Sequence, residues 1–330
     1  MTELVWAGFI VLFLGLLTLD LAVLHRESEE LSVPQALFWT AVWIGVAGCF
    51  AFAIYGLYEY HWFGFVPDDD GPATGAGAVL QYVTGYLLEW SLSVDNIFVM
   101  AVVFNFLRVP ARLQYRVLFW GIVGAIVLRG LMIGAGTALL DAFDWMFYVF
   151  GATLLVSAVR MMRADDESLP RDLGESFPAR VLRRFIPVTD ELDGTKFLVR
   201  RAGRLHATPL LLALVMIELT DVVFAVDSIP AILAVTQDPF LVFTSNAFAI
   251  LGLRSLYFAV AGLMSVFRYL RYSLVLILAF VGVKMLLVNF YHVPNLVSLG
   301  IILATLLGGI LASMVATRRE GGAAGDGPRR

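Results

Sequence analysis

The chain has 330 residues, of which 60% are hydrophobic and only 15% are charged, and its formal net charge is −4. A mean hydropathy of +0.83 excludes an ordinary soluble globular protein, and no nucleic-acid partner is expected. The one cysteine, Cys49, leaves neither a disulfide framework nor a thiolate metal site. The composition therefore predicts an all-α polytopic membrane protein.

Nine apolar segments are long enough, at about twenty residues each, to cross the bilayer as helices. The first has no basic residue before it, so we expect it to be retained as a helix rather than removed as a signal peptide. Together the nine segments form a single transmembrane domain, 1–317, with a cytoplasmic loop at about 163–208 and a glycine-rich, charged tail, 318–330, that we expect to be disordered. The predicted spans lie near 4–24, 37–58, 79–104, 115–140, 145–162, 209–235, 241–266, 272–290 and 296–317.

The basic residues are distributed unevenly between the two sides of the membrane. The connections after spans 2, 4, 6 and 8 contain no Lys or Arg, whereas the other connections, the span ends that adjoin them and the tail hold twenty of the 23 basic residues. Because cytoplasmic segments carry the excess of Lys and Arg, this pattern predicts an outside amino terminus and an inside carboxyl terminus. We therefore expect a multi-pass membrane protein.

Two similar acidic motifs lie inside predicted spans, with their first acids 132 positions apart. The first, EWSLSVDNI, begins at Glu89 and contains Asp95; the second, DVVFAVDSI, begins at Asp221 and contains Asp227. An acid at the centre of a membrane helix costs about 2.5–3.5 kcal/mol. Four such acids in a repeated pattern indicate a function, and a bound cation is the simplest one.

The repeat extends beyond the acidic motifs. Arg129 in span 4 corresponds to Arg254 in span 7, and Gly151 in span 5 corresponds to Gly282 in span 8. Three spans are an odd number, so the two copies have opposite orientations in the membrane, as in many transporters with a midplane site at the repeat interface. The copies cover spans 3–5 and 6–8, about 79–163 and 207–291.

The candidate ligands indicate the kind of ion. Carboxylate, amide and hydroxyl oxygens suit Mg²⁺, Ca²⁺ or Mn²⁺, whereas zinc prefers imidazole or thiolate, and all four histidines lie at or beyond span ends. The predicted metal-binding residues are Glu89, Asp95, Asn96, Glu218, Asp221, Asp227 and Ser228. Supporting residues are Asp20, Ser91, Thr220, Val226 and Asn246, and the predicted counter-ions or gate residues are Arg129, Arg254 and Lys284. The alternative for each acid is a purely structural ion pair.

One regular helix does not direct all the acids of span 6 to one ion. Glu218 and Asp221 share a face, but Asp227 lies about 120° away from Asp221 on an ideal helix. Pro230 has no amide hydrogen to bond the carbonyl of Val226, so we expect a local break at 226–230 that frees this oxygen as a ligand.

At these motifs the chain resembles the TerC family of bacterial integral membrane proteins, which includes the Alx-type manganese exporters. The resemblance rests on 89–99, 207–211, 218–231 and 244–256 and covers essentially spans 1–9. It implies manganese efflux, links to metal loading of exported proteins, and tellurite resistance. It also implies that the seven predicted metal-binding residues are the ion-handling positions.

Three functions compete. The first is a secondary transporter that exports Mn²⁺, or alternatively Ca²⁺, by alternating access and exchanges it for protons. The second, an intramembrane aspartyl protease, is disfavoured because Asp95 and Asp227 lack the Gly-x-Gly-Asp signature, so we expect no enzyme. The third is a non-transporting metal-binding scaffold or stress sensor linked to tellurite resistance. Besides the metal, protons and lipid, the partners could include a second copy or another membrane protein.

Overall fold

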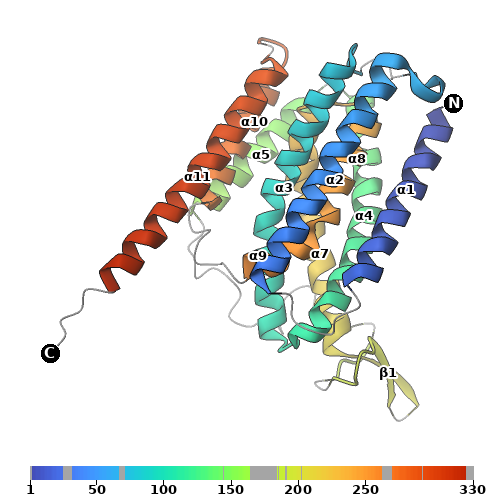
Figure 1. Ribbon diagram of the computed structural model, residues 1–330, viewed down its shortest axis with the longest axis vertical. Helices are drawn as coiled ribbons and strands as arrows, with labels where there is room; N and C mark the ends of the chain where they lie inside the picture. Colours follow the sequence, from blue (N-terminus) through green and yellow to red (C-terminus); the bar gives the residue numbers. More distant parts are fainter. Residues whose placement is uncertain are drawn as a thin grey trace.

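The computed structural model describes residues 2–24, 32–66, 71–143, 145–163, 184, 186–189, 192–201, 203–261, 270–291 and 293–324. It is almost entirely helical, as Figure 1 shows. The helices are α1 (Thr2–Leu24), α2 (Val33–Tyr60), η1 (Trp62–Gly64), α3 (Gly75–Phe106), α4 (Ala111–Ala142), α5 (Met146–Arg163), α7 (Pro209–Leu233), α8 (Pro239–Leu251), α9 (Leu253–Ala261), α10 (Leu270–Leu286) and α11 (Asn295–Ala324).

Every segment predicted to span the membrane contains a helix. Among the described residues, seven helices are long and apolar enough to cross a bilayer, and the bent pair formed by α8 and α9 makes eight. Within the predicted eighth span, α10 has 17 described residues, which is short for a membrane helix. The polytopic, all-helical class is therefore established, whereas the count of nine spans stays a prediction.

Several helix starts follow from local sequence signals. The Thr74 hydroxyl accepts a hydrogen bond from the Gly77 amide at 3.1 Å and caps α3. Asp238 caps α8 by accepting from the amides of Phe240 and Leu241 at 2.9 and 3.2 Å, and Pro239 occupies the first turn. Such caps satisfy amide groups that have no partner inside the helix.

The seventh predicted span is not one helix. It divides at Gly252 into α8 and α9, which are bent by 43°. A Cβ atom at Gly252 would lie 3.3 Å from the Cβ of Trp43, so the absence of a side chain lets α2 approach the bend closely. Glycine also weakens a helix interior, which favours a break at this position.

Two other predicted segments differ from the structure. The predicted cytoplasmic loop contains a short antiparallel hairpin of β1 (Leu198–Arg201) and β2 (Arg204–Ala207), which pairs Val199 with His206. The predicted disordered tail begins at 318, but α11 continues to Ala324. The end of the tail lies outside the described residues.

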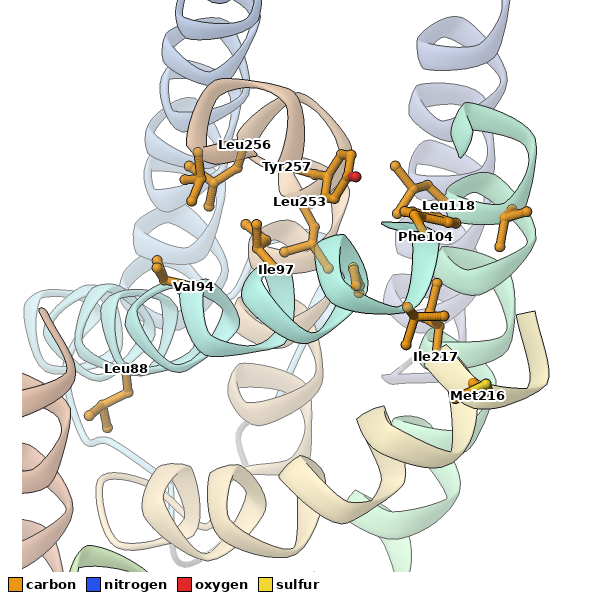
Figure 2. Packing of buried hydrophobic residues seen from close by; sticks show 14 of the residues in the cluster. Leu88, Val94, Ile97, Phe104, Leu118, Met216, Ile217, Leu253, Leu256 and Tyr257 are labelled. Atoms are coloured by element: carbon orange, nitrogen blue, oxygen red, sulfur yellow. The ribbon is translucent and has the colours of Figure 1, made fainter. Parts of the chain in front are cut away.

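The core lies around α3, which packs against α2, α7, α8 and α11. In Figure 2, Val94, Ile97 and Phe104 of α3 lie among side chains of α4, α7 and α9. The outer helices α1 and α11 differ from α3, since they expose large apolar side chains such as Val11 and Leu307. This division matches a bundle whose periphery faces lipid and whose central helix is shielded from it.

Candidate functional site

Three polar side chains of α3 form one stripe. Glu89, Ser93 and Asn96 are separated by four and three residues, the spacing that places side chains on the same side of a helix. All three are almost completely buried, at 1%, 1% and 3% exposure. The Ser93 hydroxyl lies 3.5 Å from a Glu89 oxygen, to which it donates. This stripe faces the interior of the bundle.

Arg129 of α4 joins the two acidic motifs. Its Nη1 donates to Glu89, while its Nε and Nη2 donate to the two oxygens of Asp221 at 3.0 and 2.7 Å. Arg129 is 2% exposed. The planar guanidinium group thus binds Asp221 in the bidentate manner that arginine favours, and reaches Glu89 with its remaining donors.

Neutral groups complete this network. The amide of Asn246, on α8, donates to Glu89 at 3.0 Å, and the amide of Asn96 donates to Asp221 at 3.1 Å. The oxygens of Asn246 and Ser228 lie 3.4 and 3.5 Å from Nη1 of the arginine. We call Glu89, Asn96, Arg129, Asp221, Ser228 and Asn246 the central network; if its acids are ionised, it carries one excess negative charge.

Glu218 lies beside the network without joining it. Both of its carboxyl oxygens are buried, and neither has a hydrogen-bond partner in the described structure. The side chain packs on α4, where a Cβ atom at Gly124 would overlap its carboxyl group. Gly124 therefore creates the space that Glu218 occupies.

Two small cavities flank Asp221. Each has a volume of about 10 Å³, close to the space that one water molecule needs. Glu218 and Arg254 line the first cavity, whereas Asn96 and Thr220 line the second. The carbonyl oxygen of Asn96 is also buried without a partner. Each cavity is thus lined by Asp221 together with a residue, Glu218 or Asn96, that has a buried oxygen without a partner.

Asp227 does not reach the central network. It accepts a hydrogen bond from Ser157 of α5 at 2.6 Å, on a different side of α7 from Asp221. The expected break at 226–230 is wrong, because α7 is one continuous helix from Pro209 to Leu233. Pro230 still lacks the amide hydrogen that would bond the Val226 carbonyl, but the backbone stays helical through this position and α7 ends three residues later, at Leu233. The side chain of Val226 is 47% exposed and points away from the core.

The remaining predicted residues are not part of the central network. Asp20 of α1 forms a buried ion pair with Arg254 of α9. Ser91 and Thr220 donate to carbonyls of their own helices, those of Leu88 and Met216, at 2.8 and 2.7 Å. Lys284 lines a separate cavity near the end of α10. The side chain of Asp95 lies outside the described residues.

The described residues contain no cluster of three or more His, Cys, Asp or Glu side chains arranged to hold a metal ion. In this arrangement the guanidinium group of Arg129 lies between Glu89 and Asp221 and is paired with both. Sequence reasoning missed two polar partners, Ser93 and Ser157. The four-residue spacing from Glu89 is a signal for Ser93, but nothing in the sequence relates Ser157 to Asp227.

Long apolar helices packed around buried carboxylates and a buried guanidinium define a multi-pass membrane protein with a polar interior. The model of the integral membrane protein TerC family matches residues 74–321, and the chain belongs to this family.

Curated relatives match nearly the whole chain. An uncharacterised membrane protein of Myxococcus xanthus, STKORF319, is 45% identical and covers 98% of this chain and 96% of its own length. Alx of Escherichia coli K12, whose name proposes a membrane-bound redox modulator, is 46% identical over 93% of this chain and 92% of its own. An uncharacterised membrane protein of Rickettsia bellii is 37% identical over 94% of this chain and 97% of its own. No solved structure matches the chain.

Proposed function

We propose that this protein is a secondary transporter that exports a divalent cation, with Mn²⁺ as the preferred cargo, across the bacterial inner membrane. The observation that carries the proposal is the small cavity between Glu218 and Asp221. Both residues supply hard oxygen donors, which suit Mn²⁺, Ca²⁺ and Mg²⁺.

The charges around this cavity match a divalent ion. Asp20 neutralises Arg254, so this arginine adds no net charge. The central network carries one excess negative charge, and an ionised Glu218 adds a second. A buried, ionised carboxylate without a hydrogen-bond donor is costly. A bound cation or proton therefore stabilises Glu218 more than it stabilises the acids that are already paired. Exchange of a cation for protons at this position is the transport chemistry that we propose.

In the proposed transport cycle, Arg129 is the group that a cation would displace from Asp221. It competes with any cation for the oxygens of Asp221, since it occupies both of them. A cation that enters beside Glu218 can attract Asp221 away from Arg129, which keeps its pairing with Glu89. Two alternative partners for one carboxylate provide the two states that alternating access needs.

The proposed architecture has nine spans, with the amino terminus outside and inverted repeats at about 79–163 and 207–291. A reciprocal contact between two equivalent glycines supports the repeat. A Cβ at Gly151 would lie 3.0 Å from the carbonyl oxygen of Gly282, and a Cβ at Gly282 would lie 3.0 Å from that of Gly151. Two equivalent residues that contact each other in the same way are expected at a two-fold axis.

Impermeant thiol labelling tests the orientation. In a Cys49→Ser background, Phe63→Cys should react in intact cells, and Lys196→Cys should react only after permeabilisation.

The deciding experiment measures uptake of Mn²⁺, Ca²⁺, Mg²⁺ and Zn²⁺ in parallel, in sealed vesicles with an imposed proton gradient. We expect gradient-dependent Mn²⁺ flux that Glu218→Gln abolishes and that Asp193→Asn leaves unchanged. Asp193 is a suitable control because it is exposed and paired with Lys196 in the cytoplasmic region. Wild-type flux in the Glu218→Gln protein would contradict the proposed site.

The second candidate is a metal-binding scaffold or stress sensor. The same unpartnered oxygens favour it, because they could hold a metal that is never transported. Binding without turnover in the vesicle assay would support this function. The redox role in the name of the Alx relatives would need an intermolecular thiol or another redox group, because this chain has one cysteine and forms no internal disulfide.

A further inference from the structure

A larger cavity, of about 270 Å³, lies at one end of the bundle. It is bounded by the first turns of α3, the ends of α7 and α10, and the start of α11. The ends of α3, α10 and α11 that bound it lie together at the top of Figure 1. None of the central network residues lines this cavity. It is therefore separate from the proposed cation site.

The cavity contains a positive charge without an opposite one. Among the described residues that line it, Lys284 is the only charged one, and its Nζ donates to the Asn295 oxygen at 3.4 Å. In the part of the chain that the structure describes, no acid lies within ion-pair distance of Lys284. Lys284 is half-buried, so its ammonium group stays accessible to a ligand in the cavity, and an anion is the ligand that its positive charge favours.

The neutral lining groups narrow the class of anion. Gln81, Gln237 and Thr236 add amide and hydroxyl donors to the ammonium group of Lys284. A phosphate group can accept from several of these donors at once, whereas a halide is a single acceptor atom.

We propose that this cavity binds a phosphate group through Lys284. Lysine commonly binds phosphate as a point charge, and the amides and the hydroxyl orient the remaining oxygens. The volume exceeds the roughly 10–15 Å³ that one water needs, so it accommodates a phosphate group with a few waters. The group can come from two sources, free phosphate from the aqueous side or the headgroup of an anionic phospholipid.

Binding is tested on the purified full-length protein in nanodiscs of zwitterionic lipid. Equilibrium dialysis with radioactive inorganic phosphate should show one saturable site per chain, and phosphate should raise the unfolding temperature. Lys284→Gln should weaken binding about tenfold or more, whereas Lys284→Arg should keep it. The matched control is Lys196→Gln, since Lys196 is the only other lysine in the chain and is exposed.

A second arm separates the two sources in the wild-type protein. The rate of amine modification at Lys284, measured by mass spectrometry relative to Lys196, is compared with and without phosphatidylglycerol in the nanodisc. Protection and a raised unfolding temperature only with phosphatidylglycerol assign the site to a headgroup, whereas an effect of inorganic phosphate alone assigns it to the free ion. If neither phosphate nor phosphatidylglycerol changes binding, reactivity or unfolding temperature, the proposal is overturned. The proposed phosphate site does not depend on the proposed transport function, so loss of Mn²⁺ transport in Glu218→Gln does not contradict it.

Discussion

Arg129→Met is the sharpest structural test of the central network. The substitution keeps a long side chain on α4 but removes the guanidinium donors that reach Glu89 and Asp221. Both acids are at most 4% exposed, so water cannot replace the lost partner without opening the bundle. Removal of one member of a buried ion pair typically costs about 3–5 kcal/mol, and two carboxylates lose their cation here.

The free energy of unfolding can be measured in bicelles by steric trapping or by titration with dodecyl sulfate. We expect Arg129→Met to be less stable than the wild type by about 3–5 kcal/mol. The stability of Arg129→Lys should lie between those of Arg129→Met and the wild type. A single ammonium group cannot bind both oxygens of Asp221 in the manner of Nε and Nη2.

A neutral triple variant provides the control. Arg129→Met combined with Glu89→Gln and Asp221→Asn removes the charges on both sides, and it should recover most of the lost stability, since replacing a whole buried charge cluster is often close to neutral. Equal stability of Arg129→Met and the wild type would refute the ion-pair network. A triple variant no more stable than Arg129→Met would show that hydrogen bonding, rather than charge, dominates.

Two glycine substitutions test the packing that positions the site. Gly124→Ala should displace Glu218, because the new Cβ overlaps the carboxyl group of Glu218. The affinity for Mn²⁺ should then fall about tenfold in a vesicle binding assay. Gly134→Ala, on the same helix but with open space around it, should leave this affinity unchanged. Gly282→Ala should destabilise the protein by about 1–3 kcal/mol in the unfolding assay, since α5 and α10 touch there, whereas Gly308→Ala, which meets nothing within 4 Å, should be neutral. Unchanged affinity in the first case, or unchanged stability in the second, would contradict these contacts.

The sequence predicted the helices well because a membrane leaves few alternatives to long apolar helices. It did not predict the bend at Gly252, because glycine alone does not distinguish a bend from a straight helix, and the approach of Trp43 depends on how α2 packs. The break expected at Pro230 was wrong for a related reason. Proline removes one backbone hydrogen bond, but the loss of one bond does not by itself unwind a helix, and α7 stays helical through Pro230 to Leu233.

The site shows the same limit. Spacing along a helix places Glu89 with Asn96, and Glu218 with Asp221, without any tertiary information. Spacing along a helix cannot show that Arg129 bonds to both acidic motifs, because it does not determine which helices touch. The sequence supported Arg129 as a counter-ion. The pairing of this one arginine with Glu89 and Asp221 emerged only from the packing of α3, α4 and α7.

The central network also constrains how the chain is made. Glu89 is synthesised 40 residues before its cationic partner and 157 residues before Asn246. An unpaired acid in a membrane helix costs about 2.5–3.5 kcal/mol, so α3 is poorly stabilised in lipid until α4 arrives. Arg129 is in turn synthesised 92 residues before Asp221. The network can be completed only after the ribosome has delivered α8, because Asn246 is its last member in the chain.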